Sequence, residues 1–131
     1  MKARLILNIG YAKTGTSWWQ AEVFPKLNLN YLGREYAFKS SWNPLRYKKR
    51  LVALPCKRQV QDLVDYLALG PQDKSEETVL ERLDPFLDFN QPNMISHETI
   101  LRPFSYESLF GRLQKLEKKY DLTLLLFTRK Q

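Results

Sequence analysis

One segment of the chain restricts its fold more than any other. The sequence GYAKTGTSWW, residues 10–19, holds four residues between Gly10 and Gly15. A short apolar run at residues 4–9, RLILNI, precedes the segment and is typical of a strand buried on both faces. A helical stretch from Thr16 to about Phe24 follows. A strand, a glycine loop and a helix in this order form the context of a phosphate-binding loop, because the helix N-terminus then faces the anion.

The lysine of this loop stands in an unusual position. The common phosphate-loop pattern places a lysine directly after the second glycine, where this chain has Thr16, whereas Lys13 lies inside the loop. The backbone part of the pattern is kept, because free N–H groups are expected at the start of the helix. The Lys-[Ser/Thr] pair that orders Mg²⁺ in nucleoside triphosphatases is absent, so we expect an anion site without a metal.

The rest of the chain alternates apolar strands with helical segments. We expect further strands at residues 29–32, 93–96 and 122–127. Helices are expected over 44–69 with a break near Pro55, after a cap at Ser75, and after a cap at Ser105. One side of the last helix is expected to carry Leu109, Phe110, Leu113, Leu116 and Tyr120. The pattern predicts one α/β domain, residues 1–131, with a mostly parallel sheet of about four strands and a core of the phosphate-loop type.

Composition limits the partners and the compartment. The chain has 21 Lys and Arg against 14 Asp and Glu, a formal net charge of +7, which favours anionic ligands. The basic and aromatic stretch WNPLRYKKR, residues 42–50, is a candidate surface for an acidic acceptor, although such clusters are usually solvated. The single cysteine, Cys56, excludes an internal disulfide and indicates a reducing, cytoplasmic location. No apolar run reaches the length of a membrane span.

Residues 11–18 resemble the Y-P-K-S-G-T-T-W loop of sulfotransferases, with Ala12 in the place of the proline. Two shorter stretches agree with this resemblance: MISHE at residues 94–98, and LLLFTRKQ at residues 124–131. The resemblance implies binding of 3′-phosphoadenosine 5′-phosphosulfate (PAPS) and transfer of its sulfuryl group to a hydroxyl or amine acceptor. It also implies a role for the displaced Lys13, which would neutralise the leaving phosphate.

The resemblance assigns the remaining roles by position. The loop residues would hold the phosphosulfate, Trp18 would lie against the adenine, and Arg129 would contact the 3′-phosphate. The implied donor-binding set is Tyr11, Ala12, Lys13, Thr14, Gly15, Thr16, Ser17, Trp18 and Arg129. Three residues remain candidates for the base that takes the acceptor's proton: Glu35, His97 and Glu98.

Alternatives from other classes stay open. The loop also fits a P-loop nucleotide-binding protein or kinase, and the chain could be a non-catalytic module that binds an anion or a protein partner. Sulfotransferases are usually considerably longer, so we expect a truncated form that binds the donor and turns over poorly. A homodimer through the apolar last strand is a further expectation, and nucleic acid is not expected as a partner.

Overall fold

A computed structural model describes residues 1–9, 19–41, 48–97, 100 and 106–126 of the chain. Its centre is a parallel sheet of four strands in the order β2-β5-β1-β6. The strands are β1 (Arg4–Asn8), β2 (Asn30–Tyr31), β5 (Asn93–Ser96) and β6 (Asp121–Leu125). The predicted α/β class with a parallel sheet flanked by helices is therefore confirmed, and β5 has the predicted bounds.

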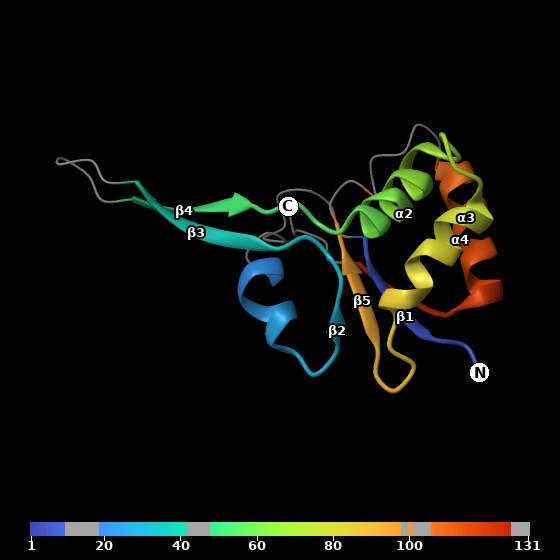
Figure 1. The fold of residues 1–131 in the computed structure, drawn as a ribbon, viewed down its shortest axis with the longest axis horizontal. Coiled ribbons are helices and arrows are strands. Elements are labelled where there is room, and N and C mark those ends of the chain that lie inside the picture. Colours follow the sequence, from blue (N-terminus) through green and yellow to red (C-terminus); the bar gives the residue numbers. More distant parts are fainter. Residues whose placement is uncertain (10–18, 42–47, 98–99, 101–105, 127–131) are drawn as a thin grey trace.

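The connections between strands leave the sheet on two faces. The β1–β2 connection runs one way along the sheet and contains η1 (Trp19–Val23) and η2 (Phe24–Lys26). The β2–β5 and β5–β6 connections run the other way and contain α2 (Arg58–Leu69), α3 (Glu76–Leu83) and α4 (Tyr106–Lys119). Right-handed crossovers in opposite directions place their helices on opposite faces. Figure 1 shows α2, α3 and α4 grouped on one side, apart from η1.

The main core lies between the sheet and these three helices. Leu5 and Leu7 of β1 and Ile95 of β5 are fully buried against it. In α2, Val60, Leu63, Val64 and Leu67 are fully buried, as their i, i+3, i+4, i+7 spacing predicts. In α4 the buried stripe is Leu109, Leu113 and Leu116, whereas Phe110 is 56% exposed. The prediction for Phe110 is wrong because its position lies about 100° around the helix from Leu109.

The helix predicted for residues 44–54 is also wrong in its described part. Two antiparallel strands, β3 (Tyr36–Ser41) and β4 (Lys48–Ala53), form a separate hairpin, with Phe38 opposite Leu51. The hairpin extends away from the body of the molecule (Figure 1). Lysine and arginine favour helices in isolation, but aromatic and β-branched residues favour strands, and pairing satisfies the backbone of both segments.

Polar side chains stabilise both ends of α3. Ser75 caps α3, since its hydroxyl accepts a hydrogen bond from the Thr78 amide, as predicted. The other predicted cap, Ser105, lies outside the described residues.

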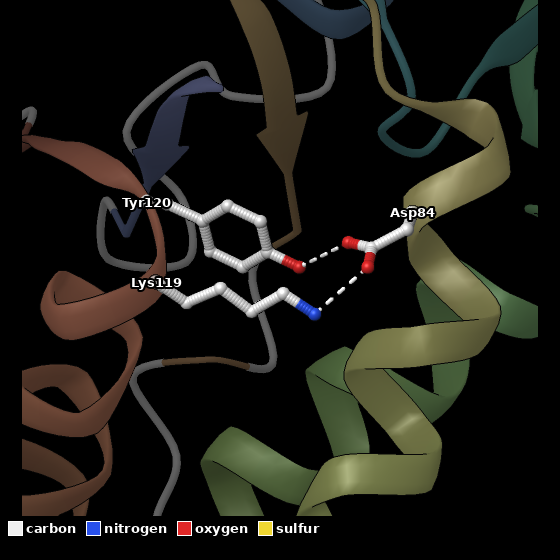
Figure 2. Close-up of polar contacts among 3 residues, drawn as sticks. All are labelled: Asp84, Lys119 and Tyr120. Carbon is white, nitrogen blue, oxygen red and sulfur yellow. Dashed lines mark hydrogen bonds and ion pairs between the residues drawn. The ribbon is translucent and has the colours of Figure 1, made fainter. Parts of the chain in front are cut away.

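Figure 2 shows Asp84, which follows α3, accepting hydrogen bonds from Lys119 Nζ at 2.8 Å and from Tyr120 Oη at 2.9 Å. Burial, and then the Asp84 carboxylate, raise the pKa of Tyr120. The ends of α3 and α4 are thereby joined.

Candidate functional site

The carboxyl ends of β1 and β5 form the point of the sheet where ligands are expected. These strands are neighbours, and their connections leave toward opposite faces of the sheet. In open α/β sheets the crevice at such a switch point is the usual ligand site. The glycine motif leaves the sheet here, after Ile9, whose amide still donates to Leu125 O of β6 at 2.9 Å. The chain is next described at Trp19, the first residue of η1.

Three buried polar residues meet at this point and are called the switch-point cluster: Asn8, Gln20 and Ser96. Asn8 Nδ2 donates to Ser96 Oγ at 2.9 Å, and Gln20 Nε2 donates to the same oxygen at 2.8 Å. All three side chains are buried, and Gln20 is 0% exposed. Asn8 precedes the glycine motif and Gln20 follows it. The Ser96 hydroxyl oxygen therefore connects the residues on the two sides of the glycine motif.

The hydrogen-bond capacity of the switch-point cluster exceeds its internal contacts. Ser96 Oγ accepts two hydrogen bonds, which occupy both of its lone pairs, so its own hydrogen is left for another acceptor. Among the described residues, Gln20 Oε1 is buried without a hydrogen-bond partner. Gln20 belongs to a π-helical turn, a rare geometry that often occurs at functional sites. The cluster therefore offers a hydroxyl donor and an amide acceptor at the carboxyl edge of the sheet.

Two of the candidate bases lie at the same edge of the sheet. His97 directly follows Ser96 and is 2% exposed. The Arg34 amide donates to Ser96 O at 3.0 Å, which places Glu35, the residue after Arg34, beyond the carboxyl end of β5 on the segment that follows β2. Glu35 is exposed, and its carbonyl accepts from the Leu54 amide at 2.9 Å. Glu98 lies outside the described residues. The structure therefore brings Glu35 and His97 to the carboxyl edge by two different strands.

Gly33 allows the close packing of this edge. A Cβ at Gly33 would lie 2.5 Å from Ser96 N and 2.8 Å from Ser96 O, closer than atoms can approach. Gly33 is thus a point of close approach between two backbone segments, and it is flanked by hydrogen bonds from Leu32 N to Met94 O and from Arg34 N to Ser96 O. A small cleft of about 180 Å³ lies beside it, with Glu35, Cys56 and Lys57 in its lining.

The structure does not describe the other predicted site residues, but it describes residues that come shortly before or after them in the chain. The donor-binding residues 11–18, which include Lys13, lie outside the described residues between Ile9 and Trp19. Arg129 also lies outside them, and β6 ends at Leu125 on the same carboxyl edge. The structure therefore fixes where the glycine motif begins and ends.

Sequence reasoning missed the switch-point cluster. A signal was present, since Asn8 is a polar residue inside an apolar strand and Ser96 ends a strand whose four residues are all buried. Nothing in the spacing of Gln20 indicated its contact with Ser96, because that contact depends on the π-helical turn.

Three further observations complete the description of the site. In the described ranges, His, Cys, Asp and Glu side chains form no group of three that could hold a metal ion. None of the helices in the described part of the chain has the length and apolar character needed to cross a membrane. Comparisons with known protein families, with curated proteins and with solved structures find no match.

Proposed function

We propose that the chain binds PAPS through residues 11–18 and supports transfer of its sulfuryl group to a hydroxyl or amine acceptor. The observation that carries the proposal is the position of the glycine motif, which leaves the central strand β1 at the switch point of a parallel sheet. A motif that resembles the sulfotransferase loop thus begins where an anionic nucleotide is expected to bind.

The switch-point cluster supports the same proposal. Asn8 and Gln20 are both bound to Ser96 Oγ, so the separation of the motif's two ends is fixed before any ligand binds. A loop held at both ends loses less conformational freedom on binding, which favours affinity. We expect Ser96→Ala to weaken donor binding, because it releases both amides from their common acceptor.

The proposed chemistry is an in-line displacement at sulfur. A base takes the proton of the acceptor, the acceptor's oxygen or nitrogen bonds to sulfur, and the bond from sulfur to the bridging phosphate oxygen breaks. Adenosine 3′,5′-bisphosphate leaves with the electron pair, and the Lys13 ammonium group would neutralise its charge. Glu35 and His97 are the candidate bases with a described position at this edge. Positioning and electrostatics carry most of such a reaction.

A turnover experiment tests the proposal. The chain is incubated with PAPS and a mixture of hydroxyl and amine acceptors, and release of adenosine 3′,5′-bisphosphate is followed by chromatography. We expect acceptor-dependent release that falls roughly 100- to 1,000-fold in Lys13→Met, the usual loss for one aligned charge-stabilising group. Mg²⁺-dependent hydrolysis of ATP without bisphosphate release from PAPS would instead support a P-loop nucleotidase.

A homodimer through β6 is the second part of the proposal. β6 is an edge strand of the described sheet, and Leu124 and Leu126 are 43% and 51% exposed. An exposed apolar edge is a template for pairing with another strand. We expect light scattering to give twice the 15.5 kDa chain mass, and Leu124→Lys to return the chain mass. A wild-type chain that stays monomeric at all concentrations would contradict the dimer.

A further inference from the structure

The net positive charge of the chain is concentrated in one segment. Residues 36–61 hold seven of the 21 Lys and Arg and none of the 14 Asp and Glu, so the rest of the chain carries 14 of each. Four of the seven cations belong to the strands of the β3–β4 hairpin, namely Lys39, Lys48, Lys49 and Arg50. The hairpin strands therefore carry most of the excess charge, and they extend away from the body of the molecule (Figure 1).

The register of the hairpin sorts its positions onto two faces. Directly opposite residues of an antiparallel pair share a face, and successive residues of one strand alternate between faces. Lys39 is opposite Arg50, and Ser41 is opposite Lys48. Positions 39, 48 and 50 therefore lie on one face, which we call the cationic face, and the strands place no carboxylate there. In the helix that the sequence alone predicts, positions 48 and 50 would be about 200° apart around the axis.

The cationic face is electrostatically unfavourable without a partner. Like charges directly opposite each other destabilise a strand pair, and Lys39 and Arg50 form such a pair. The two strands form a sheet of their own, separate from the central sheet, and a two-stranded hairpin has little stability by itself. A polyanion bound along this face would replace the repulsion with attraction to both cations.

We infer that the hairpin binds the major groove of B-form DNA through its cationic face. That groove is about 12 Å wide and 8.5 Å deep, and it admits a two-stranded β-ribbon. Each strand of the hairpin has six residues, about 20 Å of extended chain. Phosphates line both walls of the groove, and the cationic face has Lys39 on β3 and Lys48 and Arg50 on β4.

The shape of the molecule allows this mode of binding. Because the hairpin extends away from the body, it can enter a groove while the body stays outside (Figure 1). Composition alone does not favour a nucleic-acid partner, and the argument for DNA comes from the register and the extended form of the hairpin. The inference does not depend on the proposed sulfuryl transfer, since the hairpin strands share no residue with the proposed donor site.

Fluorescence anisotropy of a labelled DNA duplex of about 20 base pairs, titrated with the whole chain, tests the inference. We expect a Kd of about 1–100 μM at physiological salt, and a slope of roughly −2.7 for log K against log salt if three phosphates are contacted. An RNA duplex of matching sequence has the same charge but a deep, narrow major groove, so it should bind at least about tenfold more weakly. Equal binding of the RNA duplex, or tighter binding of heparin or of phosphatidylserine vesicles, would overturn the inference.

Charge-matched variants locate the binding. Lys48→Gln combined with Arg50→Gln should weaken DNA binding by about tenfold or more and make the salt slope shallower by about 2. Arg82→Gln combined with Lys118→Gln removes the same charge from exposed positions of α3 and α4, and it should leave the affinity and the slope unchanged. Equal losses in the two double variants would show attraction by net charge alone and would refute the site.

One further variant separates DNA binding from the stability of the hairpin. Lys39→Glu places a carboxylate opposite Arg50, so a like-charge pair becomes an opposite-charge pair. Its melting temperature without DNA should therefore equal or exceed that of the wild type, whereas its affinity for the duplex should fall by about tenfold or more. A Lys39→Glu chain that binds the duplex as tightly as the wild type would exclude the cationic face as the DNA-binding surface.

Discussion

Gly33 offers the sharpest test of how the carboxyl edge is built. In Gly33→Ala the new Cβ would stand 2.5 Å from Ser96 N, 2.7 Å from Tyr31 Oη and 2.8 Å from Ser96 O, where ordinary contacts are 3.4–4 Å. The backbones of residue 33 and Ser96 must separate by roughly 1 Å, and such overpacking costs about 1–3 kcal/mol. The separation also strains the hydrogen bonds from Leu32 N and Arg34 N, so we expect a loss of about 2–4 kcal/mol.

The matched control is a glycine with room for a side chain. A Cβ at Gly111 in α4 meets nothing within 4 Å, so Gly111→Ala should stabilise the protein by about 0.5–1 kcal/mol through helix propensity. Thermal unfolding followed by circular dichroism measures both variants. We expect the melting temperature to fall by roughly 5–20 °C in Gly33→Ala and to rise by about 2–5 °C in Gly111→Ala. A Gly33→Ala protein as stable as the wild type would refute the close approach.

Three further predictions concern stability. Asn93 makes four hydrogen bonds, to Arg4 O, to Asp88 O and N, and to Asn30 Nδ2, so Asn93→Ala should cost about 3–5 kcal/mol in denaturant unfolding, while the exposed Asn90→Ala should stay within about 0.5 kcal/mol. Ser75→Ala should cost about 0.5–2 kcal/mol, because it removes the cap of α3; an unchanged midpoint would contradict that role. The raised pKa values of Tyr66 and Tyr120 stabilise the fold fully below the ordinary tyrosine pKa near 10, and this contribution is lost as the pH rises above it, since the unfolded chain ionises first. Phenolate absorbance should therefore show these two side chains ionising together with alkaline unfolding, and their ionisation in the folded protein would exclude the contribution.

Sequence patterns were sufficient where one local rule decides the structure. The sequence predicted α2 because burial on one face of a helix leaves apolar residues at a regular spacing, and it predicted β5 because burial of a strand on both faces leaves a short continuous run. The cap of α3 was predictable because Ser75 contacts a residue only three positions away.

The features that the sequence did not predict depend on contacts between residues far apart in the chain, which leave no local pattern. The β3–β4 hairpin replaces an expected helix because backbone pairing between the two strands outweighs the helix propensity of its lysines and arginines. The switch-point cluster joins residues far apart in sequence, 88 positions for Asn8 and Ser96. The ion pair between Asp62 and Lys74 likewise depends on Gly70, whose φ of 85° turns the chain at the end of α2.

The most direct test of the account is calorimetric titration of the chain with adenosine 3′,5′-bisphosphate. The account predicts saturable binding by the wild type and a loss of about tenfold or more in Lys13→Ala, since a charge-assisted contact to phosphate disappears. Lys26→Ala removes an exposed lysine that forms an ion pair with Glu22 one turn away, and it should bind as the wild type does. No binding by the wild type at millimolar ligand, or equal losses in both lysine variants, would contradict the proposed donor site.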